Sequence, residues 1–117
     1  MTTSNSTTLR VGIIQQTCCA DVEANKQKLA RNIADVAAQG AQLVVLQELH
    51  NSLYFCQTEN TQLFDLAEPI PGPSTDFYGE IARQHGIVLV TSLFERRAAG
   101  LYHNTACLLY TSDAADE

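Results

Sequence analysis

The chain has 117 residues, of which 45% are hydrophobic and 17% are charged, and its formal net charge is −6. This length fits one domain or part of one, and the low charged fraction predicts a compact fold with a sizeable core. Three of the acids lie in the last five residues, which leaves ten acids against seven bases, a net charge of −3 that is too mild to favour nucleic acid or an anionic membrane as a partner.

The chain begins with a polar tail, Met1 to Thr8, that is rich in serine and threonine. The tail has neither the positively charged region nor the apolar region of a secretory signal. No apolar run in the sequence approaches the length of a membrane span. We therefore expect a soluble, cytoplasmic protein whose cysteines are reduced.

The next segments predict a βαβ unit. Leu9–Gln15 is rich in β-branched residues and predicts a strand, and Asp21 is a suitable N-cap for a helix that runs to about Gln39. Gly40 fits the left-handed position past the helix end, and Leu43–Leu46 predicts a second, parallel strand. The apolar residues that recur at helical spacing are Leu29, Ile33, Val36 and Ala37.

A long irregular segment, Asn51–Pro73, separates this unit from a second helix. A loop of this length inside a compact domain is usually functional or disordered, and its three aromatic residues argue against disorder. The helix begins at Pro73 and closes at His85-Gly86. We expect its inward residues to be Phe77, Ile81 and Ala82.

Two strands complete the predicted order. Ile87–Leu93 is almost entirely apolar, which is typical of a strand in the interior of a sheet. Ala98–Gly100 forms a turn into the fourth strand, Leu101 to about Tyr110. Within it Cys107 alternates with apolar neighbours, so we expect its side chain in the core.

Glu48 is the first candidate functional residue, because it follows the buried strand Leu43–Leu46. Open α/β folds bind their ligands at the carboxyl ends of strands. A carboxylate there suits general acid–base catalysis, and it is paired or used because an unpaired buried charge is costly. Glu48 could instead be a surface acid or a helix-capping acid.

A metal site is a second interpretation of the same segment. In an extended segment Glu48 and His50 would point the same way, with Cys56 or His103 as further ligands. No third ligand lies at a sequence spacing that is characteristic of a metal site, so we expect no metal here. We expect His50 to be a loop residue that is hydrogen-bonded to backbone.

The cysteines offer a third interpretation. Cys18 and Cys19 lie between the first strand and the helix, where an activated thiol could be a nucleophile, although small cysteines that merely pack are commoner. None of the cysteines has CxxC spacing or partner histidines at zinc-ligand offsets. No glycine-rich phosphate loop follows the first strand, which disfavours a dinucleotide site. We expect no cofactor.

Four segments in characteristic order and spacing resemble the nitrilase (carbon–nitrogen hydrolase) superfamily, and the resemblance extends from Leu9 to Leu109. They are Val11–Gln16, Gly40–Leu49, Pro71–Thr75 and Leu101–Ala106. Two more segments, Asn51–Gln57 and Ser92–Glu95, resemble the N-carbamoylputrescine amidases within that superfamily. Those enzymes hydrolyse N-carbamoylputrescine to putrescine, carbon dioxide and ammonia in polyamine synthesis.

The resemblance implies an α/β fold, namely the βαβαββ portion of a nitrilase-type α-β-β-α sandwich. It also implies a catalytic set of a cysteine nucleophile, a glutamate general base and a lysine that stabilises the tetrahedral intermediate. Glu48 matches the glutamate, while the lysine and the cysteine of the family lie beyond the matched segments. We therefore expect the isolated chain to be inactive and, with one sheet face exposed, poorly soluble or molten.

The resemblance also suggests substrate-binding residues and partners. Tyr54 shapes the substrate pocket or anchors its loop. Asn104 hydrogen-bonds near the carboxylate or is a buried asparagine of a turn or strand, and Glu95 lines the site or pairs with Arg96 or Arg97. The expected partner is a small carbamoyl-amine or amide substrate, without nucleic acid or membrane. Full-length relatives assemble into homo-oligomers.

We expect residues 1–8 to be a tail, residues 9–110 to be the N-terminal part of a carbon–nitrogen hydrolase domain, and residues 111–117 to be a non-family tail that is artefactual. The sequence is also compatible with different functions. The substrate could be that of an N-carbamoyl-β-alanine or ω-amidase type enzyme. The chain could also be a non-catalytic ligand-binding α/β module, or an interaction protein that docks a partner at its sheet edge.

Overall fold

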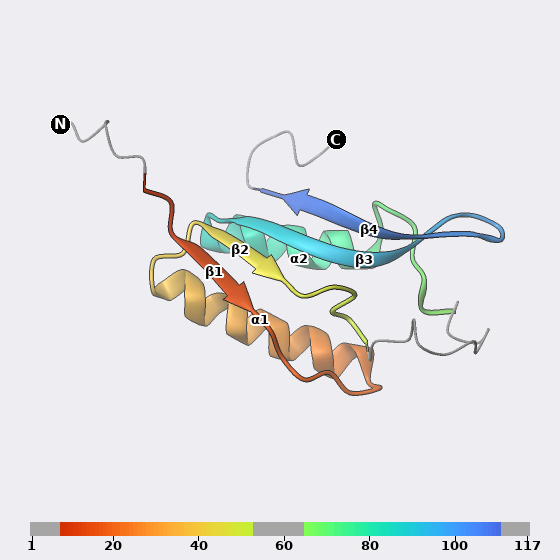
Figure 1. Cartoon of the computed structure of the whole chain (residues 1–117), viewed down its shortest axis with the longest axis horizontal. Helices are drawn as coiled ribbons and strands as arrows, with labels where there is room; N and C mark the ends of the chain where they lie inside the picture. Colours follow the sequence, from red (N-terminus) through yellow and green to blue (C-terminus); the bar gives the residue numbers. More distant parts are fainter. Residues whose placement is uncertain (1–7, 53–64, 111–117) are drawn as a thin grey trace.

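The computed structural model of the chain describes residues 8–52 and 65–110. The elements follow in the order β1 (Val11–Ile14), α1 (Val22–Ala38), β2 (Leu43–Leu46), α2 (Pro73–His85), β3 (Val88–Ala98) and β4 (Leu101–Leu109) (Figure 1). The sheet order is β1-β2-β3-β4, with the first three strands parallel and β4 antiparallel to β3. The predicted α/β fold and βαβαββ order are confirmed.

Helix α1 begins and ends where the sequence predicts. The Asp21 side chain accepts a hydrogen bond from the Ala24 amide at 3.2 Å, which satisfies one of the free amides of the first turn. Gly40 follows the helix with φ of +100°, a conformation that disfavours any residue with a Cβ. Leu29 and Ile33 are fully buried, and Val36 and Ala37 pack at the border of the core.

Helix α2 also has the predicted bounds, and Ile81 and Ala82 are buried as predicted. Ser74 and Tyr78 are fully buried as well, so the inward face is centred on Ser74, Tyr78 and Ala82, which recur every four residues. Phe77, which was predicted to point inward, is only partly buried, and Lys26 of α1 lies 4.6 Å from its ring centroid. The burial of Tyr78 could not be predicted from its residue type, because tyrosine is intermediate between buried and exposed residue types.

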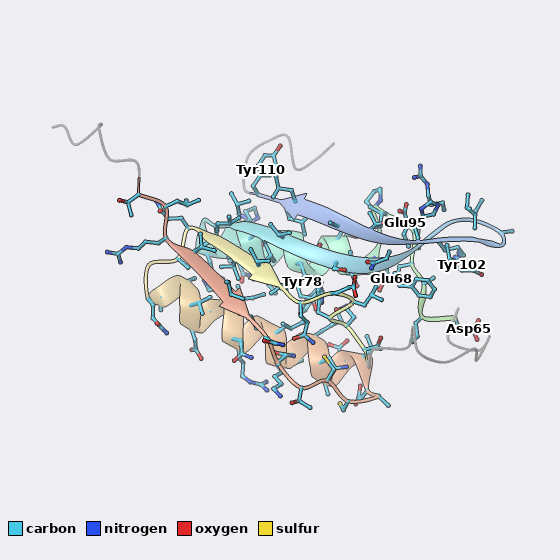
Figure 2. All side chains as sticks on the ribbon, in the orientation of Figure 1. Asp65, Glu68, Tyr78, Glu95, Tyr102 and Tyr110 are labelled. Atoms are coloured by element: carbon cyan, nitrogen blue, oxygen red, sulfur yellow. The ribbon has the colours of Figure 1, made fainter. Side chains whose placement is uncertain are left out.

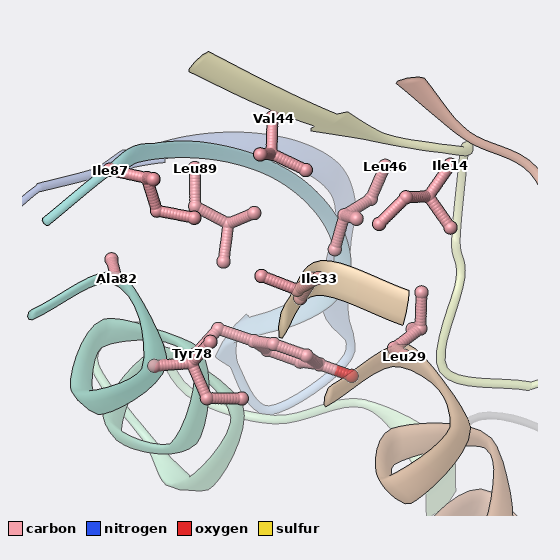
Figure 3. Packing of buried hydrophobic residues seen from close by; sticks show 10 residues of the cluster. Ile14, Leu29, Ile33, Val44, Leu46, Tyr78, Ala82, Ile87 and Leu89 are labelled. Carbon is pink, nitrogen blue, oxygen red and sulfur yellow. The ribbon is translucent and has the colours of Figure 1, made fainter. Parts of the chain in front are cut away.

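Both helices lie on one side of the sheet (Figure 1). Alternate residues of β2 and β3 are buried, as expected for side chains that point toward the helices. Figure 3 shows the ring of Tyr78 lying below the sheet and between the two helices, near Leu29 and Ile33. Burying a large apolar side chain of this kind stabilises a fold by about 1.5–3 kcal/mol. The buried strand residues of this cluster are Ile14, Val44, Leu46 and Leu89.

The opposite side of the sheet, here called the open face, is apolar but uncovered in the part of the chain that the structure describes. Ile13 is 76% exposed and Leu108 is 59% exposed, although both stand in strands. A contiguous apolar surface of this kind is typical of an interface. The strand residues that share the open face by register are Val11, Ile13, Leu43, Val45, Val88, Val90, Ser92, Phe94, Asn104, Ala106 and Leu108.

Strands β3 and β4 form a long hairpin that reaches beyond the ends of β1 and β2 (Figure 1). β3 is an interior strand, as predicted, but it continues to Ala98 because pairing with β4 supports its polar end. Cys107, predicted to lie in the core, is only half-buried, because β4 is an edge strand of the sheet. None of the helices within residues 8–52 and 65–110 is long and apolar enough to span a bilayer.

Candidate active site

Glu48 lies just past the carboxyl end of β2, as predicted, in a turn that reverses the direction of successive side chains. Leu49 has φ of +49°, a left-handed conformation that non-glycine residues rarely adopt, and its side chain is buried. Glu48 is therefore exposed while His50 is fully buried. The idea that both side chains point the same way is wrong, because it assumed an extended backbone.

Three hydrogen bonds close a ring around the Glu48 carboxylate. Asn104 Nδ2 on β4 donates to Glu48 Oε1 at 3.0 Å, and Ser92 Oγ on β3 donates to Asn104 Oδ1 at 2.9 Å. The Leu49 amide donates to Ser92 Oγ at 3.0 Å. Only the Asn104 bond reaches the carboxylate, and the other two link Asn104 through Ser92 to the backbone directly after Glu48. We name these three bonds the Glu48 ring.

A second set of hydrogen bonds holds the other end of the turn at Asn51. The Tyr78 hydroxyl donates to Asn51 Oδ1 at 2.6 Å, and Asn51 Nδ2 donates to Ser74 Oγ at 2.7 Å. Ser74 Oγ in turn donates to Glu68 Oε2 at 2.7 Å, and Asn25 Nδ2 donates to the Asn51 carbonyl at 2.9 Å. Figure 2 labels Tyr78 and Glu68, which approach this turn from α2 and from the segment before it. Side chains of both helices therefore fix the turn that carries Glu48.

His50 fills the space between the turn and α2. Its ring makes an edge-on contact with Tyr78, with ring centroids 5.0 Å apart. Neither ring nitrogen has a hydrogen-bond partner among the described residues, so the predicted bond to backbone is wrong. Burial lowers the pKa of His50 from 6.5 to about 4, because a charged ring would lose its hydration there.

We expect His50 to make stability depend on pH. The unfolded chain takes up this proton near pH 6.5 and the folded chain only near pH 4, so the unfolded state binds more protons between these values. The free energy of unfolding should fall by about 3 kcal/mol in total as the pH drops through this window. Urea denaturation at several pH values measures it, in the 117-residue chain or in a longer protein if the short one associates.

The control for this prediction is a second histidine. His50→Phe should remove the dependence between pH 6.5 and 4, and His103→Phe should keep it, because His103 is exposed on β4. An unchanged pH profile in His50→Phe would contradict the assignment.

Residues on both sides of the turn line a small cavity. Its volume is about 30 Å³, which holds about one water molecule and is too small for a carbamoyl amine. Glu48 is not among the lining residues, although its neighbour Leu49 and its ring partner Ser92 are. The full lining is Val22, Leu49, Asn51, Ser52, Leu66, Glu68, Ser92, Leu93 and Phe94.

The other predicted site residues fall in different places. Asn104 contacts Glu48 directly, whereas Tyr54 lies outside the described residues. Glu95 lies on the helix-facing side of β3, 9% exposed, where it accepts a hydrogen bond from Thr105 at 2.7 Å (Figure 2). Arg97 lies 3.9 Å from the Glu95 carboxylate, so the ion pair that the sequence also allowed is present. Asn104 and Glu48 are brought together and Glu95 is not.

Two of the described cysteines make poor nucleophiles. Burial raises the pKa of the Cys18 thiol, which donates a hydrogen bond to the His50 carbonyl at 3.2 Å. Burial also raises the pKa of Cys107. Because the thiolate is the reactive form, both are less reactive than an ordinary cysteine at neutral pH. In residues 8–52 and 65–110, no three histidine, cysteine or acidic side chains are grouped to bind a metal.

The sequence alone did not single out Ser92 or Asn51 as part of this site. Ser92 interrupts the apolar run of β3, and a lone hydroxyl in such a run is a signal that it has a partner on the same face. Asn51 follows Glu48 by three residues in a segment treated as a loop. The distances to β4 and α2 depend on tertiary packing, which local patterns do not give.

Comparison with known proteins agrees with this architecture. The carbon-nitrogen hydrolase family matches residues 10–114. The structure of a carbon-nitrogen hydrolase from Helicobacter pylori is 35% identical, with a TM-score of 0.82, and the match covers 88% of this chain and 36% of that one. An amidase from Nesterenkonia, a glutamate-to-leucine variant with an acetamide moiety on its active-site cysteine, is 25% identical with a TM-score of 0.73, over 88% of this chain and 38% of that one.

Curated relatives include enzymes with different substrates. A citrullinase from Francisella tularensis is 33% identical over 86% of this chain and 35% of its own length. An N-carbamoylputrescine amidase from Solanum lycopersicum is 30% identical over 84% of this chain and 33% of its own length. The chain thus spans about a third of the length of the curated relatives it matches. With the family match over residues 10–114 and the shared fold, the chain belongs to the carbon–nitrogen hydrolase family of the nitrilase superfamily.

Proposed function

We propose that Glu48 is the general base of an amidohydrolase whose N-terminal part is this chain. The observation that carries the proposal is the position of Glu48, at the end of a parallel strand and bonded to Asn104 at 3.0 Å. Its place at the carboxyl end of β2 matches where α/β folds bind ligands. The family match over residues 10–114 supports hydrolysis of a carbon–nitrogen bond.

In the proposed mechanism the Glu48 carboxylate takes the proton of a cysteine thiol. The resulting thiolate attacks the carbonyl carbon of the substrate, and a lysine stabilises the negative charge that develops on the carbonyl oxygen. The cysteine adduct of the Nesterenkonia amidase supports a thiol nucleophile in this family. We propose that the cysteine and the lysine lie beyond the part that corresponds to Leu109, in a longer protein.

The proposed substrate is N-carbamoylputrescine, cleaved to putrescine, carbon dioxide and ammonia. Plant N-carbamoylputrescine amidases among the relatives support it, as do the segments Asn51–Gln57 and Ser92–Glu95. A second candidate is a different amide, such as an ω-amidase or N-carbamoyl-β-alanine amidase substrate, because a Xenopus laevis ω-amidase is 34% identical over 76% of this chain. Asn104, Tyr54 and Glu95 remain candidate substrate-binding residues.

We propose that the 117-residue chain alone does not turn over substrate. The cavity beside the Glu48 turn is too small for a substrate molecule. Burial raises the pKa of the Cys18 thiol, which disfavours the reactive thiolate. On this view residues 9–110 form the hydrolase portion, the chain departs from it within residues 111–117, and the longer protein is a homo-oligomer.

Sequencing the reading frame and assaying both proteins tests the proposal. The longer protein should carry a lysine and then a cysteine beyond Leu109, and it should release ammonia from N-carbamoylputrescine, while the short chain should not. Ammonia release from an ω-amide, but not from N-carbamoylputrescine, would favour the second candidate. Turnover by the pure 117-residue chain would overturn the proposal that the catalytic lysine and cysteine lie outside it.

A further inference from the structure

Ser92 stands on the open face of β3 between Val90 and Phe94. Its hydroxyl oxygen makes two of the three bonds of the Glu48 ring, accepting from the Leu49 amide and donating to Asn104 Oδ1. The hydroxyl group thus joins the backbone directly after Glu48 to the amide that binds the Glu48 carboxylate.

The direction of each bond in the ring follows from chemistry alone. A backbone N–H can only donate, so Ser92 Oγ must accept from Leu49. A carboxylate can only accept, so Asn104 Nδ2 must face Glu48 and donate to it. The other end of the amide, Oδ1, therefore faces Ser92 and accepts its single hydroxyl proton.

We propose that Ser92 is a positioning residue that acts on Glu48 through Asn104. This inference rests on the proposed function of Glu48. Without the hydroxyl group, Asn104 Oδ1 loses its donor, so the Asn104 side chain keeps its bond to the Glu48 carboxylate but no longer anchors that carboxylate to β3. The Leu49 amide loses its partner in the same step, which frees the turn that aims Glu48.

The neighbouring Thr91 provides a matched control. It also lies in β3 and also bonds across to β4, donating to the Cys107 carbonyl at 3.3 Å. Its side chain points to the helix-covered side of the sheet, away from the Glu48 ring. Thr91→Val therefore removes a β3 hydroxyl group without touching Glu48, Leu49 or Asn104.

NMR of the longer hydrolase tests the ring without any need for activity. In Ser92→Ala the hydrogen exchange of the Leu49 amide should accelerate about tenfold or more, because its partner is gone, and the Asn104 side-chain amide signals should shift. Thr91→Val should leave both unchanged. Unchanged exchange and unchanged signals in Ser92→Ala would overturn the ring.

Kinetics of the longer hydrolase test the positioning role. Ser92→Ala should lower kcat about 10- to 100-fold with little change in KM, because the base is misaligned while substrate binding remains. Ser92→Thr keeps the hydroxyl group and should restore most of kcat. A wild-type kcat in Ser92→Ala, or a loss that Ser92→Thr does not restore, overturns the inference. Retained turnover in Glu48→Gln would instead overturn the proposed function and leave the NMR result standing.

Discussion

Replacement of Glu48 by glutamine should reduce kcat of the longer hydrolase by about a thousandfold, the middle of the range for the loss of a general base. Glutamine has almost the same shape, and its amide oxygen can still accept the bond from Asn104 that now reaches Glu48 Oε1 at 3.0 Å. It cannot take up a proton at neutral pH. The change therefore removes the proposed chemistry while leaving the turn in place.

Steady-state ammonia release at saturating substrate measures this effect, and the circular dichroism spectrum checks the fold. Glu23→Gln is the control, because Glu23 is an exposed acid in the first turn of α1 that takes no part in the Glu48 ring and undergoes the same chemical change. A Glu48→Gln protein with wild-type kcat would remove Glu48 from the mechanism. A loss of equal size in Glu23→Gln would point to a general effect of charge.

Truncation of Tyr78 should have the largest effect on stability. Tyr78 is fully buried between the helices, so Tyr78→Ala should lower the free energy of unfolding by about 3–5 kcal/mol through lost burial and a new cavity. Its hydroxyl group also donates to Asn51 Oδ1 at 2.6 Å. Tyr78→Phe removes only that donor and should cost about 1–3 kcal/mol, the penalty of leaving a partly buried oxygen unsatisfied.

Urea denaturation of the two variants separates packing from hydrogen bonding. Tyr102→Ala serves as the control, because Tyr102 is a half-exposed tyrosine on the hairpin outside the core cluster. If Tyr78→Ala lowers the free energy of unfolding no more than Tyr102→Ala does, burial of Tyr78 between the helices does not stabilise the fold. If Tyr78→Phe costs nothing, Asn51 is not held by the hydroxyl group.

The order and bounds of the elements followed from the sequence because they depend on local signals. The aspartate cap at Asp21, the prolines before α2 and the glycines after both helices each act within a few residues, so their effect can be predicted without knowledge of the fold. The end of β3 was misjudged, because its pairing with β4 outweighs the polar character of Glu95 to Arg97.

The candidate site was predictable only in part, and the reason is geometric. Glu48 could be found because it marks a strand end, and its contact with Asn104 was foreseen as a possibility from the family resemblance. The buried state of His50 was missed because it depends on one left-handed residue, Leu49. A leucine in the sequence does not predict a positive φ, because the surrounding packing and the bond to Ser92 impose this conformation.

The conformation of Leu49 also limits how the segment can change in length. The Glu48 side chain before it is exposed to solvent, while the side chains of Leu49 and of His50 after it are buried. Deleting or inserting one residue between Gln47 and Asn51 would shift this change from exposed to buried by one position, which would force an acid into the core or an apolar side chain into solvent. The segment can therefore tolerate single substitutions more readily than a change in its number of residues.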